Sequence, residues 1–125
     1  MGSISYVPAT QQYLLTFVCM SQNGNPANEN GVAGAAWFFS TTYDLSNPSE
    51  WTTPQEIVGT WRPYVSQNGQ SCNSFNGWYP SFMSLGQKPG YLTSTGYVFY
   101  MQGCSGGDTP GGRQYSTRTF TITTN

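Results

Sequence analysis

Residues 34–42, Gly-Ala-Ala-Trp-Phe-Phe-Ser-Thr-Thr, decide the fold class of this 125-residue chain. The run is rich in aromatic and β-branched side chains and begins at a glycine, which is typical of a β-strand. Similar runs follow one another along the chain, and none shows the apolar spacing of a helix. We therefore expect an all-β fold of antiparallel strands. The expected strands span residues 4–7, 13–20, 34–42, 55–58, 79–85, 96–102 and 114–123.

These strands form two similar series, which we interpret as an internal repeat. Each series begins with an aromatic-x-Pro segment, Tyr6-Val7-Pro8 in the first and Trp78-Tyr79-Pro80 in the second. An aromatic strand ending near Cys19 or Cys104, a polar loop and a third strand then follow in each series. This order of elements is that of one β-propeller blade. The length fits one domain. We expect a single all-β domain over residues 1–125, with blade-like repeats at 4–60 and 75–124.

The charge composition excludes some classes of protein. Charged residues make up 7% of the chain and the formal net charge is -1, so the basic surface of a nucleic-acid-binding protein is absent. No apolar run is long enough to span a membrane, and the first residues lack the cationic and apolar regions of a signal peptide. Ser, Thr, Asn, Gln and Gly replace the usual Lys and Glu, which favours a secreted protein. We expect a secreted, extracellular location, with the signal peptide not present in this chain.

The chain contains no histidine and no Cys-x-x-Cys pair. Zinc sites and histidine-based catalysis therefore lack their usual residues, and we expect no metal and no cofactor. The three cysteines allow one disulfide. Cys72 and Cys104 lie in loop sequence rich in Gly, Ser and Asn, so we expect them to form the disulfide. Cys19 lies in an apolar strand and is the expected free thiol.

Five acidic residues are present, and glycosidases need two carboxyl groups near the bond that they cleave. Glu29, Glu50, Glu56 and Asp108 lie in or beside expected loops, where we expect solvated side chains. Asp44 precedes a turn and is expected to cap it. We expect no catalytic residue in this chain.

Aromatic residues next to arginine suggest a binding site. Trp61-Arg62-Pro63-Tyr64 and Trp78-Tyr79-Pro80 lie on either side of the Cys72 loop. Aromatic rings stack on sugar rings, and guanidinium groups donate hydrogen bonds to hydroxyls. Most other aromatic side chains are needed for the core, because aliphatic residues are few. The expected ligand-binding residues are Trp61, Arg62, Trp78, Tyr79 and Arg113.

The aromatic-x-Pro segments and residues 36–51, Ala-Trp-Phe-Phe-Ser-Thr-Thr-Tyr-Asp-Leu-Ser-Asn-Pro-Ser-Glu-Trp, resemble the five-bladed propeller glycoside hydrolases of the family 43 type and their fungal relatives. In that family a similar Ser-x-Asp-Leu-x-x-Trp segment forms a strand and the following turn. These motifs mark blades and carry no catalytic residue. The chain is similar to the C-terminal two blades only. The resemblance implies a partial propeller, either completed by association in a homo-oligomer or packed as a sandwich of two sheets.

The resemblance implies a noncatalytic carbohydrate-binding or interaction domain derived from a glycoside-hydrolase-like propeller. Carbohydrate is then the expected partner, with neither nucleic acid nor membrane. Two alternatives stay open, because a fold does not fix a function. One is a fragment or subunit of a glycosidase that acts on plant cell-wall polysaccharide. The other is a structural or stress-related protein.

Overall fold

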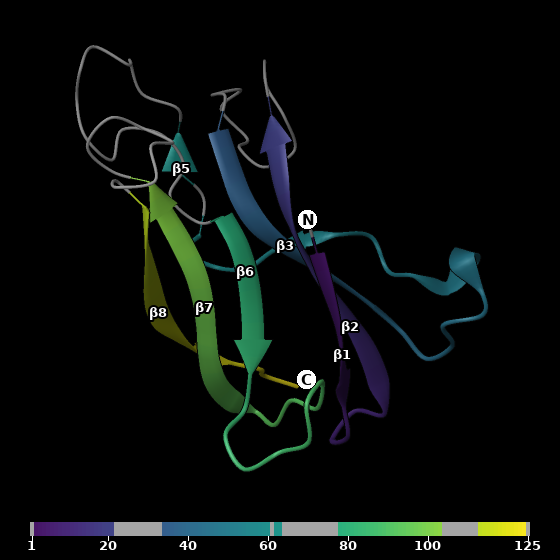
Figure 1. The fold of residues 1–125 in the computed structure, drawn as a ribbon. Coiled ribbons are helices and arrows are strands. Elements are labelled where there is room, and N and C mark those ends of the chain that lie inside the picture. Colours follow the sequence, from purple (N-terminus) through teal and green to yellow (C-terminus); the bar gives the residue numbers. More distant parts are fainter. Residues whose placement is uncertain (1, 22–33, 61, 64–77, 104–112, 125) are drawn as a thin grey trace.

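A computed structural model of the chain describes residues 2–21, 34–60, 62–63, 78–103 and 113–124. Within these ranges the chain forms antiparallel β-sheets and one short 3-10 helix, which confirms the all-β prediction (Figure 1). No helix in these ranges has the length and apolar character needed to cross a bilayer. The elements are β1 (Gly2–Val7), β2 (Gln12–Ser21), β3 (Gly34–Thr42), η1 (Pro48–Glu50), β4 (Gln55–Glu56), β5 (Arg62–Pro63), β6 (Trp78–Met83), β7 (Thr95–Gly103) and β8 (Arg113–Thr121).

The first sheet contains β1 to β4 in sequence order, and β5 pairs with the start of β3. Its two central strands, β2 and β3, pair from Tyr13 and Thr42 to Ser21 and Gly34. The strand expected at 55–58 is shorter in the structure, because the chain turns after Glu56. The Thr60 N–H closes this turn by donating to the Ile57 carbonyl at 3.2 Å.

The second sheet contains β6, β7 and β8, again in sequence order. β7 and β8 pair without interruption from Thr95 and Thr121 to Gly103 and Arg113. The pairing of β6 with β7 shifts between Trp78 and Ser81. Tyr79, which lies within this irregularity, has a φ of 55°. Positive φ is uncommon for a residue with a side chain, and here it accompanies the bulge.

In the part of the chain that the structure describes, an apolar cluster lies between the two sheets. Trp37 of the first sheet contacts Val98 and Tyr100 of the second, and all three side chains are buried. The Trp37 ring meets the Phe82 ring edge to face, with the ring centroids 6.1 Å apart. Val18 and Ile57 pack on the same cluster. Burial of each large side chain stabilises the fold by about 1.5–3 kcal/mol.

A second cluster lies on the opposite face of the first sheet. Successive side chains of a strand point to opposite faces, so Ala36 and Phe38 point away from the cluster that contains Trp37. Both are buried, and Phe17 and Cys19 pack against them. The Phe17 and Phe38 rings stack with centroids 6.1 Å apart. Cys19 is a free thiol, as the apolar sequence around it predicts.

The open edge of β1 is joined to the segment that connects β6 and β7. The Tyr6 N–H donates to the Gly90 carbonyl at 2.6 Å, and the Leu92 N–H donates to the Tyr6 carbonyl at 2.9 Å. Leu92 is among the most deeply buried side chains. β1 and β6 also contact each other. The first strands of the two sheets therefore lie side by side, and a parallel bridge between Tyr6 and Tyr91 covers part of the edge of β1.

Candidate binding cleft

The residues expected to bind a ligand lie mainly at strand ends. Trp78 begins β6 opposite Met101, and Arg113 begins β8 opposite Gly103. Since β6 and β8 flank β7, the structure brings the backbones of Trp78 and Arg113 to the same end of that strand. Arg62 lies in β5, which belongs to the other sheet. Trp61 lies outside the described residues.

Tyr79 is the one member of the expected set whose side chain can be placed. It is 61% exposed in β6 and does not line the cleft described below. The expected disulfide cysteines, Cys72 and Cys104, lie outside the described residues, as do Glu29 and Asp108.

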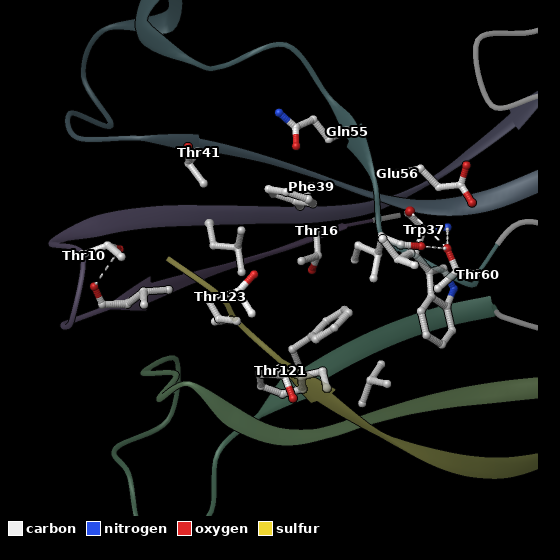
Figure 2. Close-up of a pocket in the computed structure, with 18 of the residues that line it drawn as sticks. Thr10, Thr16, Trp37, Phe39, Thr41, Gln55, Glu56, Thr60, Thr121 and Thr123 are labelled. Carbon is white, nitrogen blue, oxygen red and sulfur yellow. Dashed lines mark hydrogen bonds between the residues drawn. The ribbon is translucent and has the colours of Figure 1, made fainter. Parts of the chain in front are cut away.

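A cleft of about 860 Å³ lies between the two sheets (Figure 2). Its size falls within the usual range for small-molecule sites. Side chains from β2 and β3 form one wall. These are Leu14, Thr16, Trp37, Phe39 and Thr41.

Side chains alternate between the two faces along β2 and β3, which explains why these five residues form one wall. Thr16 pairs with Phe39, and Leu14 pairs with Thr41, so these residues stand in adjacent rows on one face of the sheet. The Thr16 hydroxyl is buried and lies 2.9 Å from the Ser3 hydroxyl. Phe39 is half-buried. The wall therefore presents the Phe39 ring to the cleft, whereas the Thr16 hydroxyl is engaged with Ser3.

The opposite wall is the end of β8 and the segment after it. Every residue from Arg118 to Thr124 lines the cleft. β8 is an edge strand. Where the backbone of an edge strand faces a cleft, residues from both faces of that strand can line the cleft. The Ile122 N–H donates to the Ser94 carbonyl at 2.7 Å and holds this segment against the second sheet. Figure 2 shows Thr121 and Thr123 across the cleft from Thr16 and Phe39.

The rim of the cleft carries further polar and aromatic groups. Tyr43, which is 69% exposed, lies on the rim together with Thr10 and Gln12. Gln55 pairs with Phe39 and Glu56 with Phe38. By alternation the Gln55 amide stands on the cleft face, whereas the Glu56 carboxylate stands on the opposite face at the edge. Of the described residues that line the cleft, Glu56 alone is acidic.

Thr60 holds the base of the cleft in place. Its hydroxyl accepts from the Trp37 N–H at 3.0 Å and donates to the Ile57 carbonyl at 2.8 Å. Because Thr60 is buried, these bonds satisfy polar groups that water does not reach. The turn after β4 is thereby fixed to the strand that carries Trp37.

Arg118 is the one basic residue among the described residues that line the cleft. Its guanidinium carbon lies 5.7 Å from the centroid of the Tyr100 ring. A cation over an aromatic ring is attracted by the ring's electrons, so Tyr100 restrains the Arg118 side chain. Arg118 pairs with Val98 in the sheet and therefore shares the inner face with the apolar cluster.

The prediction that Asp44 caps a turn is confirmed. Its carboxylate accepts from the Ser46 hydroxyl at 2.6 Å and from the Ser46 N–H at 2.8 Å. The Ser46 hydroxyl first, and the Ser46 N–H second, hold the pKa of this carboxyl below its ordinary value. Asn47 then accepts from the Ser49 N–H and begins η1, whose first residue is Pro48. Asp44 therefore stabilises the turn through these hydrogen bonds.

Comparison with known proteins gives no family assignment. No protein-family model matches the sequence, and no curated protein matches it.

Proposed function

We propose that this chain is a noncatalytic carbohydrate-binding domain and that the cleft between the sheets is its binding site. One observation carries the proposal. The cleft combines many uncharged hydroxyl and amide groups with exposed aromatic surface, and a single carboxylate lies at its edge. Sugars present hydroxyl groups on an apolar ring, so they suit such a lining.

The positions of the carboxylates favour binding over hydrolysis. Glycoside hydrolysis uses two carboxyl groups that flank the scissile bond. Asp44 accepts hydrogen bonds within its own turn, and Glu50 lies in the exposed helix η1. Only Glu56 among the described acids lies at the cleft. The described residues thus supply no pair of carboxylates that faces a ligand there.

The arrangement of the strands supports derivation from a propeller. Each sheet is an antiparallel meander in sequence order, and the first strands of the two sheets contact each other. Neighbouring blades of a propeller have this relation around a central axis. A secreted location fits the same proposal, because the carbohydrate would be met outside the cell.

Two matched tyrosines test the site. Tyr43 lies on the rim of the cleft and Tyr79 belongs to the set expected from the sequence, and their exposures are 69% and 61%. Titration calorimetry with arabino- and xylo-oligosaccharides is expected to show binding that Tyr43→Ala weakens and Tyr79→Ala leaves unchanged. The reverse pattern would move the site to the residues around Tyr79.

A turnover assay tests the noncatalytic assignment. The purified chain is expected to release no product from arabinan, xylan or aryl glycosides. Steady hydrolysis that Glu56→Gln abolishes would overturn the assignment and support a glycosidase. Absence of binding to every neutral oligosaccharide tested would instead favour a structural role.

A further inference from the structure

The second sheet has an outer face that points away from the first sheet. We propose that this face is a docking surface for a second copy of the chain. It is defined by Met83, Tyr97, Phe99, Tyr115, Thr117 and Thr119, of which Thr119 lies at the end of β8 that also lines the cleft. None of these side chains belongs to the apolar cluster between the sheets.

Strand register places the six side chains in adjacent rows. Tyr97 pairs with Met83 on one side and with Thr119 on the other. Phe99 pairs with Thr117 in the next row, and Tyr115 pairs with Met101 in the row after that. Side chains in neighbouring rows of one face lie within contact distance. The outer face is therefore a continuous surface of aromatic rings, a thioether and hydroxyl groups.

The sequence of β7 indicates that this face is covered. Residues 97–101, Tyr-Val-Phe-Tyr-Met, form an unbroken apolar run. Strands exposed on one face alternate apolar and polar residues, whereas strands covered on both faces have continuous apolar runs. Val98 and Tyr100 are buried against the first sheet, but Tyr97 and Phe99 are 39% and 36% exposed. The outer half of the run lacks a cover within the described residues.

The exposed area is sufficient for a weak dimer. Met83 and Tyr115 are 44% and 81% exposed, and Tyr97 and Phe99 add to them. With side-chain areas of about 150–250 Å² each, the four exposed fractions together offer about 300–500 Å² per copy. Two such faces would bury about 600–1,000 Å² in total, which is the size of a weak, transient interface.

The lack of charge favours a second copy as the occupant. A two-fold axis brings the same patch of both copies together, so a charge near the axis would meet its own copy. None of the six residues is charged, and Phe99 lies in the middle row. Phe99, at the centre of the face, offers no hydrogen-bonding group, whereas a polysaccharide surface requires partners for its hydroxyls. The same face of a second copy carries no charge and needs no hydrogen-bonding partner at its centre, so it fits this face.

Sedimentation velocity over a concentration series tests the proposal. We expect a dimer that dissociates on dilution, with a dissociation constant of about 1–100 µM. Phe99→Lys and Tyr115→Lys are each expected to weaken it about tenfold or more, because each places an unpaired charge in an apolar interface. Tyr115 is mostly exposed, so Tyr115→Lys tests the face even if Phe99→Lys unfolds the chain. Circular dichroism checks the fold of each variant.

Val58→Lys is the matched control, because Val58 is 96% exposed and lies at the cleft. It is expected to leave the dimer unchanged. A wild-type chain that stays monomeric throughout, or a dimer insensitive to both lysine variants at the outer face, would overturn the proposal. So would a dimer that Val58→Lys weakens equally. A monomer that co-sediments with insoluble cellulose and loses this property in Tyr115→Lys would show that the face binds polysaccharide instead.

Discussion

Trp37 and Tyr100 meet edge to face across the two sheets, with ring centroids 5.1 Å apart and planes inclined at 65°. Trp37 lies in β3 and Tyr100 in β7, so this contact joins the central parts of both sheets. The Trp37 backbone is itself tied to Thr60, and Tyr100 lies beside Arg118. The cluster that holds the sheets together thus also positions two residues that line the cleft.

Loss of either ring is expected to destabilise the fold strongly. Trp37→Ala and Tyr100→Ala should each lower the free energy of unfolding by about 3–5 kcal/mol, because each leaves a cavity between the sheets. A double-mutant cycle should return a coupling of about 0.5–1.5 kcal/mol for the edge-to-face pair. Urea denaturation followed by fluorescence measures both values. Tyr79→Ala, at an exposed position, is the control, and equal losses in all three variants would contradict the assignment of this core.

Thr60 provides a separate test of the base of the cleft. Thr60→Val keeps the shape of the side chain but removes the acceptor for the Trp37 N–H, so it should cost about 1–3 kcal/mol of unfolding free energy. Thr60→Ser keeps the hydroxyl and should lose less. Thr117→Val, on the exposed face of β8, should change stability by no more than about 0.5 kcal/mol. Urea denaturation of the three variants gives the comparison, and an unchanged Thr60→Val variant would show that the hydrogen bond contributes little.

Gly96 lies too close to its neighbours for any side chain. A Cβ atom there would lie 2.7 Å from carbon atoms of the Phe120 ring and would also meet the Met83 carbonyl oxygen. Gly96→Ala should therefore destabilise by about 1–3 kcal/mol through overpacking. Gly86 has open space and a φ of +77°, which asparagine tolerates, so Gly86→Asn is the matched control. Thermal unfolding compares the two, and a neutral Gly96→Ala would indicate that β6 and β8 shift easily.

The strands could be predicted because each has its own local pattern. Aromatic and β-branched runs bounded by Gly, Pro or Asn indicate where strands begin and end, and every expected strand is present with ends within two residues. β5 was not predicted. Its two residues, Arg62 and Pro63, pair with the start of β3, and proline has no N–H to donate to a sheet. This pairing follows from tertiary contact and leaves no repeating pattern in the sequence.

The cleft could not be predicted in the same way. The expected ligand-binding residues are aromatic and arginine residues in or beside loop sequence, whereas the cleft joins Thr16 and Phe39 with residues 118–124. That arrangement depends on how the two sheets pack, which no single segment determines. The threonines at 119, 121, 123 and 124 that line the cleft are close in sequence, but their spacing does not indicate that Thr16 and Phe39 lie across from them.

The stability of the turn at Asp44 is expected to depend on pH. The Ser46 hydroxyl and then the Ser46 N–H stabilise the carboxylate, so the pKa of Asp44 is lower in the folded chain than in the unfolded chain. The contribution of this group to stability is therefore fully present above the ordinary aspartate pKa of about 3.9 and is lost as the pH falls through the lower folded value. Because Asp44 is fully exposed, we expect the effect to be small and local.

Two serine variants separate the causes of this pKa shift. Ser46→Ala removes the hydroxyl donor but keeps the backbone N–H, so it should raise the pKa of Asp44 part of the way toward its ordinary value. Ser49→Ala is the control, because the Ser49 hydroxyl donates to Asn47 at 2.7 Å and not to Asp44. Carboxyl-carbon NMR titration of the three chains measures the difference. A larger rise in Ser49→Ala than in Ser46→Ala would mean that the charge of Asp44 is stabilised by the η1 segment as a whole.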